Sequence, residues 1–376
     1  MKHIRLVIVF AAIASVLVVS CGAGGGAEIK IGNINPVTGE AATFGQSTKN
    51  GATMAADEWN AKGGILGKKI KLVYADDKGD PAEGAAVFTK MIQQDKVAAI
   101  LGGITSRVAL AGAPIAQAAK VPMLTPTATN EKVTQVGDYI FRSCFIDSFQ
   151  GTVAAKYVAN ELKATKAAVI FDVGSDYSKG LAENFKAVFE SAGGKVVASE
   201  AHPSGATDFK AQLTKIVQAK PEVLFVPDFY NDVGLIAKQV RELGFKGAMV
   251  GVDGWDSPEL VKIAGDAIEG GVFVNHYSKD DTRPLIQDFV KKYQEKYKAD
   301  PDALAALSYD GANILFDAIK RAGKVDAVAI RDALQATDSE AVIGKIKYDA
   351  NRNPIKSAVI IELKAGKQVY KTTVNP

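Results

Sequence analysis

The chain has 376 residues, of which 47% are hydrophobic and 23% are charged. This length is enough for about two domains, and the composition excludes an intrinsically disordered chain. The formal net charge is only +3 and the Lys and Arg residues form no basic block, so nucleic acid is not an expected partner.

The first residues have the pattern of an export signal. MKHIR is basic, and the apolar run LVIVFAAIASVLVV has the length of a signal-peptide core and is too short for a membrane span. The run ends in small residues before Cys21, which resembles the lipobox of bacterial lipoproteins. On this interpretation residues 1–20 are a lipoprotein signal peptide, Cys21 is lipidated, and the glycine-rich segment 21–27 is a tether. The alternative is ordinary cleavage near Ala27.

From residue 28 onward, strand-like runs alternate with helix-like segments. The strands are continuous apolar runs, which indicates burial on both faces and a parallel sheet between helices. In the first unit the predicted strands are EIKIGNI, KIKLVYADD, VAAILGGI and VPMLTPTA. One of the helices between them is predicted to begin at Pro81, because proline suits the first turn of a helix.

The same order repeats, with predicted strands KAAVIFDVG, KVVASEA, PEVLFVPDF and GAMVGVDG. The remaining segment reads as two amphipathic helices, over 283–299 and 303–323, followed by a hairpin or strand pair over 343–366. We therefore predict an α/β protein of two doubly wound parallel-sheet lobes joined by a multi-strand hinge. The first lobe takes residues 28–147 and 277–361, and the second takes 148–276 and 362–376.

Polar and aromatic residues follow the predicted strands, at the end where ligands bind in open α/β sheets. Each has an ordinary alternative as a helix cap or turn residue. Taken together they predict a cleft, with hydroxyls and a helix N-terminus for an anion on one lobe and a carboxylate with aromatics for a cation on the other. A ligand with both charges on one carbon is an α-amino acid. The residues are Thr105, Ser106, Thr125, Thr127 and Thr129 in the first unit, and Tyr177, Phe229, Tyr230 and Asp253 in the second.

The mature sequence resembles the branched-chain-amino-acid-binding proteins of bacterial ABC transporters, within the type I periplasmic binding fold. The resemblance is carried by the order and spacing of several short motifs. These are PVTG at 36–39, NAKGGI at 60–65, DD at 76–77 with DP at 80–81, LTPTAT at 124–129, Arg142 with Asp147 and QG at 150–151, Tyr177 with GL at 180–181, and IGKIKYD at 343–349.

The resemblance implies a set of ligand contacts by position. Ser106 falls on the serine that binds the α-carboxylate, and Thr129 on the threonine that uses its hydroxyl and backbone. Thr127, next to Ala128, offers a backbone carbonyl to the α-ammonium, and Asp253 an acid that pairs with it. The leucine/isoleucine/valine binder has Glu where Asp253 stands, so the carboxylate here lies one methylene further back. The pocket is completed by Thr105, Tyr177, Phe44 at the rim, and Phe229, which falls on a tyrosine unless a shift lets Tyr230 serve.

The resemblance implies a periplasmic or cell-surface binding protein, anchored only by its N-terminal lipid, that passes an amino acid to ABC permease subunits. A monomer without a cofactor is expected. Catalysis and a metal site are not expected, because only His3, His202 and His276 supply imidazole and neither H-E-x-x-H nor G-x-S-x-G occurs. The alternative is a ligand-sensing receptor component of the same fold that binds an amino acid, an amide or a small carboxylate.

Overall fold

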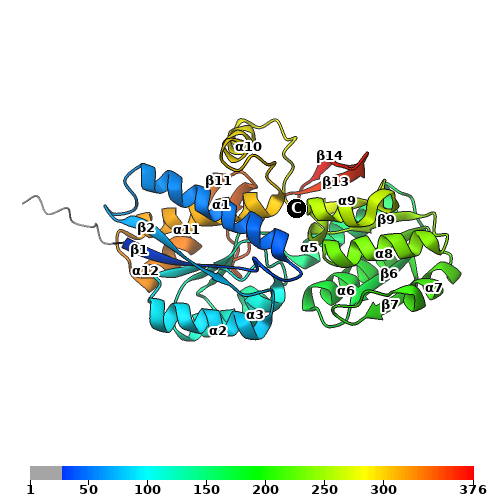
Figure 1. Cartoon of the computed structure of the whole chain (residues 1–376), viewed down its shortest axis with the longest axis horizontal. Coiled ribbons are helices and arrows are strands. Elements are labelled where there is room, and N and C mark those ends of the chain that lie inside the picture. The colour runs from blue at the N-terminus through cyan, green and yellow to red at the C-terminus, as the bar shows by residue number, and fades with distance from the viewer. Residues whose placement is uncertain (1–27) are drawn as a thin grey trace, which may run out of the picture.

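The computed structural model describes residues 28–376, which form two lobes side by side along the long axis of the molecule (Figure 1). The predicted signal peptide, tether and Cys21 lie outside the described residues. The first lobe begins with β1 (Glu28–Asn35), α1 (Ala42–Ala61), β2 (Lys69–Asp76), α2 (Pro81–Lys90), the π-helix η1 (Met91–Asp95), β3 (Ala99–Gly102), α3 (Ser106–Ala118), β4 (Met123–Thr125), α4 (Lys132–Gln135) and β5 (Ile140–Arg142).

Helix α2 begins at Pro81, as the sequence predicts. Asp80 is its N-cap, and the carboxylate of Asp80 accepts two N–H groups of the first turn. The second lobe contains α5 (Asp147–Asn160), β6 (Lys166–Asp172), α6 (Asp176–Ser191), β7 (Lys195–His202), α7 (Lys210–Gln218), β8 (Val223–Phe225), α8 (Tyr230–Glu242), β9 (Ala248–Gly251), η2 (Asp253–Trp255), α9 (Pro258–Ala264), η3 (Gly265–Ile268) and β10 (Val272–Asn275).

The chain then returns to the first lobe through long helices and ends in the second lobe. Helix α11 packs along α1, and α12 packs on α11. The elements of this last segment are α10 (Pro284–Tyr297), α11 (Ala303–Ala322), α12 (Ala327–Gln335), β11 (Asp338–Ala341), β12 (Gly344–Lys347), β13 (Ala358–Lys364) and β14 (Lys367–Val374).

Each lobe contains one main sheet. The first has the order β2-β1-β3-β4-β5 with every pair parallel. The second has the order β14-β13-β10-β9-β8-β6-β7 and is parallel from β7 to β10, with β13 and β14 added antiparallel at one edge. The predicted α/β class with two parallel-sheet lobes is therefore confirmed.

The chain passes between the lobes three times, after β5, after β10 and before β13 (Figure 1). By sheet membership the last passage precedes Ala358, a few residues earlier than the expected division at 361. The hairpin or strand pair expected over 343–366 does not form, because its two strands, β12 and β13, do not pair with each other. Strand β12 pairs with β11 in a small separate sheet, whereas β13 pairs with β10 and β14, so the two strands belong to different lobes.

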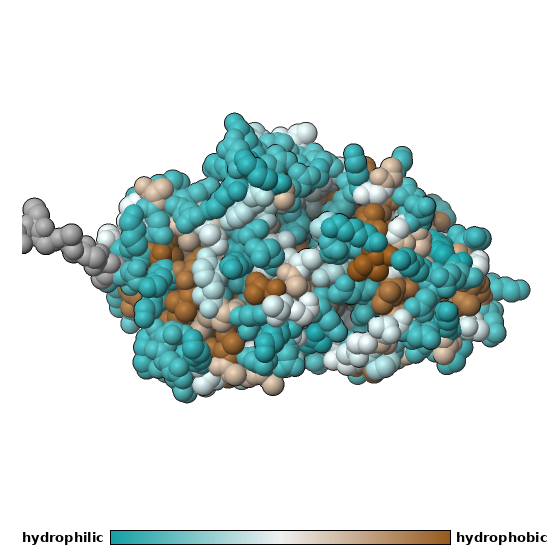
Figure 2. Space-filling view, in the orientation of Figure 1, coloured by the Kyte–Doolittle hydropathy of each residue, from teal (hydrophilic) through white to brown (hydrophobic). Residues whose placement is uncertain are grey.

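Apolar side chains fill the space between each sheet and the helices on both of its faces. Helices α1, α10 and α11 cover one face of the first sheet, and α2 and α3 cover the other. Two further clusters flank the second sheet. The outer surface in the view of Figure 2 is mostly hydrophilic, with scattered apolar residues. Within residues 28–376, no helix combines the length and apolar character needed to cross a membrane.

Candidate functional site

The N-terminus of helix α3 forms one corner of a cavity between the lobes. Its N-cap residue, Thr105, makes no side-chain capping bond, and Ser106 is the first residue of the helix rather than its cap. The Ser106 hydroxyl accepts a hydrogen bond from the backbone N–H of Asn130 (3.2 Å), so it keeps its own proton for donation. This corner offers neutral donors at the positive end of a helix dipole, a chemistry suited to a carboxylate.

Threonines at the end of β4 and just after it fix the neighbouring loops to one another. The Thr125 hydroxyl donates to the carbonyl of Gly103 (2.7 Å), and the Thr127 hydroxyl donates to the carbonyl of Ile104 (2.6 Å). These hydroxyls therefore satisfy loop backbone, which is the ordinary role of threonine in turns. Thr127 and Thr129 both line the cavity.

Arg142 of β5 holds the same loop from behind. Its side chain is fully buried and donates to the carbonyls of Ala128 (3.0 Å) and Asn130 (2.7 Å). The carbonyl of Ala128 is thus directed at Arg142. Ala128 was expected to line the cavity because of its position in the motif, but it does not.

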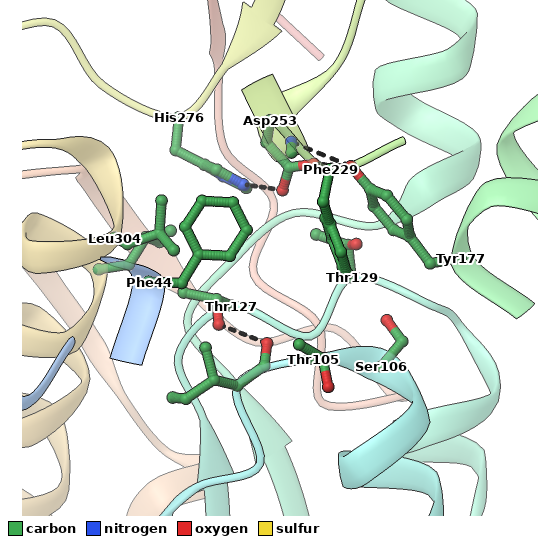
Figure 3. Close-up of a pocket in the computed structure, with 13 residues that line it drawn as sticks. Phe44, Thr105, Ser106, Thr127, Thr129, Tyr177, Phe229, Asp253, His276 and Leu304 are labelled. Carbon is green, nitrogen blue, oxygen red and sulfur yellow. Dashed lines mark hydrogen bonds and ion pairs between the residues drawn. The ribbon is translucent and has the colours of Figure 1, made fainter. Parts of the chain in front are cut away.

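Asp253 stands on the opposite wall, directly after β9. One carboxylate oxygen, Oδ1, accepts the Tyr177 hydroxyl (2.6 Å), and the other, Oδ2, lies 3.0 Å from Nε2 of His276. The backbone N–H of Gly254 donates to the Tyr177 oxygen (3.0 Å), which fixes that hydroxyl in place. Figure 3 shows Tyr177 and His276 on either side of Asp253.

Both neighbours of Asp253 are uncharged at neutral pH. Burial, followed by the charge of Asp253, raises the pKa of Tyr177 well above its usual range, so its hydroxyl stays protonated. Burial, followed by the charge of Lys356, lowers the pKa of His276 to about 4, although Asp253 acts in the opposite direction. The second lobe therefore presents one carboxylate supported by two neutral groups.

Aromatic and aliphatic side chains close the cavity between these polar walls. Phe44 meets Phe229 edge to face at 5.5 Å between ring centroids, and Phe229 stacks on Tyr177 at 5.2 Å. Ile104, Leu304 and Leu307 complete the apolar lining. Such a lining suits an aliphatic or small aromatic group.

The two lobes touch around the cavity. The Tyr230 hydroxyl donates to the carbonyl of Glu40 (2.9 Å), and Asn130 Nδ2 donates to the carbonyl of Asp176 (3.0 Å). Each bond joins one lobe to the other, so the structure has a closed arrangement.

Most of the residues expected from the sequence meet at this cavity. Phe229 lines it, whereas the hydroxyl of Tyr230 is used in the contact with Glu40. Among the described residues, no group of three or more His, Cys, Asp or Glu side chains is placed to hold a metal ion. The expected residues that line the cavity are Phe44, Thr105, Ser106, Thr127, Thr129, Tyr177, Phe229 and Asp253.

Sequence reasoning missed further lining residues. Ile104 and Gly254 are chain neighbours of predicted contacts, and His276 follows β10 in the same way that Asp253 follows β9. The strand-end rule could have found His276. Leu304 and Leu307 come from α11 and carry no such signal.

Two α/β lobes with a closed cavity between them define a solute-binding protein of the two-lobe type. Residues 28–368 match the family model described as "Periplasmic binding protein", and the chain belongs to this family. The fold and family are those of solute-binding proteins rather than enzymes.

Three similar proteins have a name or a bound molecule that indicates what they bind. The Leu/Ile/Val-binding protein BraC3 of Rhizobium johnstonii is 36% identical over 325 residues, which is 86% of this chain and 88% of the relative. The branched-chain amino acid transporter substrate-binding protein of Streptococcus pneumoniae, solved with isoleucine, has a TM-score of 0.88 and 36% identity over 93% of this chain and 100% of its own. A solute-binding protein of R. palustris, solved with benzoate, has a TM-score of 0.84 and 25% identity over 93% and 97% of the two chains.

Proposed function

We propose that this chain captures an aliphatic L-α-amino acid in its interlobe cavity and delivers it to the permease of an ABC transporter. Leucine, isoleucine and valine are the leading candidates. The observation that supports this most is the opposition of the Asp253 carboxylate on one lobe to Ser106 and the N-terminus of α3 on the other, with apolar side chains between them. The R. johnstonii and S. pneumoniae relatives support the same ligand class.

In this proposal the first lobe binds the ligand carboxylate. The Ser106 hydroxyl, the N–H groups of the first turn of α3 and the Thr129 hydroxyl donate to it, and Thr105 forms the adjoining wall. The ammonium lies between the Thr127 carbonyl and Asp253. The side chain of the ligand packs among the apolar residues Phe44, Ile104, Phe229, Leu304 and Leu307.

The ammonium contact decides which small molecules bind well. Asp253 already receives the hydroxyl of Tyr177 and faces Nε2 of His276, so it is not without partners before a ligand arrives. A keto acid with the carboxylate and side chain of leucine would leave that negative charge without a cation. Losing one partner of a buried charge pair costs about 2–5 kcal/mol, and the two existing partners favour the lower end of this range.

The test is calorimetry on the wild-type protein with leucine, isoleucine, valine and the keto acid of leucine. We expect leucine to bind more tightly than the keto acid by a factor of about 30 or more, since 1.4 kcal/mol corresponds to tenfold in affinity. Equal affinities for the two compounds would reject the amino-acid assignment and leave a carboxylate binder.

A second candidate is a small-carboxylate binder or the ligand-sensing component of a receptor. The benzoate complex of the R. palustris relative favours a small-carboxylate binder, because benzoate carries no ammonium. Benzoate is therefore included in the same titrations. Tight binding of benzoate together with weak binding of leucine would favour this candidate.

Family membership implies a protein that works outside the cytoplasm. We propose further that Cys21 carries a lipid anchor and that the protein acts as a monomer whose lobes close on the ligand by a hinge motion. Mass spectrometry of the mature N-terminus tests the anchor. A diacylglyceryl adduct on Cys21 is expected, and an unmodified N-terminus near Glu28 would contradict it.

A further inference from the structure

His276 lies at the carboxyl end of β10 and contacts the carboxylate that we assign to the ligand ammonium. Its side chain is 1% exposed, and its Nε2 lies 3.0 Å from Oδ2 of Asp253. The imidazole stacks on Phe145 with 3.6 Å between ring centroids. The backbone N–H of His276 donates to the side chain of Asn275 (2.8 Å), so both the ring and the backbone of this residue are held.

The protonation of the imidazole follows from its surroundings. The ring is neutral at neutral pH, because burial and the charge of Lys356 lower the pKa of His276 to about 4. A neutral imidazole carries one N–H, and an ionised carboxylate only accepts hydrogen bonds. The proton must therefore be on Nε2, pointing at Asp253. Within the described residues Nδ1 is buried without a partner, which agrees with a bare nitrogen at that position.

Tyr177 and His276 together determine how the Asp253 carboxylate is turned. Each oxygen receives one donor, the hydroxyl at Oδ1 and the imidazole at Oδ2. A carboxylate accepts about four hydrogen bonds, so two acceptor positions remain for an incoming ammonium. With the hydroxyl alone, the carboxylate could rotate about its Cβ–Cγ bond and turn these positions away from the cavity. A second donor on the other oxygen removes that freedom.

We propose that His276 is a positioning residue that orients Asp253 and thereby sets the preference for α-amino acids over the matching keto acids. This inference rests on the proposed function, since it concerns the same ammonium contact. A merely packing role for the ring would affect both compounds alike.

The experiment compares two substitutions that separate the donor from the ring. His276→Phe keeps an aromatic ring against Phe145 and removes the N–H. His276→Gln removes the ring and keeps an N–H donor at similar reach. Calorimetry measures leucine and its keto acid on the wild type and on both variants, and the melting temperature of each free protein reports folding.

We expect His276→Phe to weaken leucine by about 10- to 100-fold, the range for a lost hydrogen bond to a charged group, with little change for the keto acid. His276→Gln is expected to retain most of the preference. If His276 only competed with the ammonium for the carboxylate, His276→Phe would bind leucine more tightly. That result, or an unchanged ratio between the two ligands, would overturn the inference while leaving the amino-acid function in place.

If the wild type itself bound leucine and the keto acid equally well, the proposed function would be rejected, and this inference with it. A second measurement tests the inference even if His276→Phe does not fold. The ¹⁵N spectrum of the wild type, assigned by comparison with His276→Gln, should show the proton of His276 on Nε2. A proton on Nδ1 would overturn the positioning role directly.

Discussion

The two walls of the cavity are built from different chemistry. On the first-lobe wall, none of the described lining residues is ionisable, and its polar groups are hydroxyls and backbone. The second-lobe wall contains Asp253, with Tyr177 and His276 bonded to it. One wall thus offers oriented neutral dipoles, whereas the other carries a formal charge.

This difference shows how a small zwitterion can be bound in a buried place. A carboxylate can be held by N–H and O–H dipoles that the fold has already oriented, so no buried lysine or arginine has to be provided for it. An ammonium needs an acceptor with negative charge, and that acceptor must itself be supported when it is buried. Because the two walls belong to different lobes, a ligand that contacts both favours the closed state over the open one.

Arg142 holds the loop of the first-lobe wall in place, so replacing it should give the largest effect on stability. Its guanidinium donates to the carbonyls of Ala128 and Asn130, and both the donor and these residues are buried. Arg142→Met would remove the charged donor from both carbonyls. The Ala128 carbonyl would keep only the weak bond from the Cys144 thiol (3.4 Å), and the Asn130 carbonyl would keep the N–H of Val133 (3.1 Å). A hydrogen bond that involves a charged group contributes about 1.5–3 kcal/mol, and two are lost, so we expect a loss of about 2–5 kcal/mol in the free energy of unfolding, measured by urea denaturation.

A matched control for this substitution lies close by. Arg352 also donates to backbone carbonyls, those of Thr134 (2.8 Å) and Ile140 (3.2 Å), but its side chain is only partly buried. Water can replace its bonds, so Arg352→Met should cost about 1 kcal/mol. Equal losses in the two variants would mean that Arg142 has no special part in fixing the loop after β4.

The sequence predicted the sheets behind both walls better than the individual side chains that line the cavity. Alternating apolar runs are a local signal, and they indicated two parallel-sheet lobes. The strand-end rule then placed Ser106 and Asp253 on facing edges, because every parallel strand ends at the same side of its sheet.

The features that sequence could not supply depend on distant packing. Whether β12 pairs with β13 or with β11 is decided by the lobe in which each lies, and the run of residues 343–366 contains no mark of that division. Leu304 reaches the cavity only because α11 packs along α1. Arg142 was part of a motif, but its spacing gave no indication of the carbonyls that it binds.

The contrast between the walls can be tested with one substitution on each. Asp253→Asn removes the formal charge from the second-lobe wall and keeps the size of the side chain. We expect it to weaken leucine by about 2 kcal/mol, close to 30-fold, and to change the keto acid much less, because the keto acid has no ammonium to lose. The ratio of the two affinities should therefore fall towards one in calorimetry.

Ser106→Ala removes a hydroxyl from the first-lobe wall and should give the smaller and different result. The hydroxyl is assigned to the carboxylate, which leucine and its keto acid share, so both compounds should weaken together by about 1 kcal/mol, or roughly fivefold. Some of this loss also comes from the bond that Ser106 accepts from the N–H of Asn130, and the melting temperature of the free variant measures that part. Because the charge on the other wall is untouched, the ratio between leucine and keto acid should stay at its wild-type value. A variant in which leucine alone weakened would place Ser106 at the ammonium end of the ligand and reverse the orientation proposed for it.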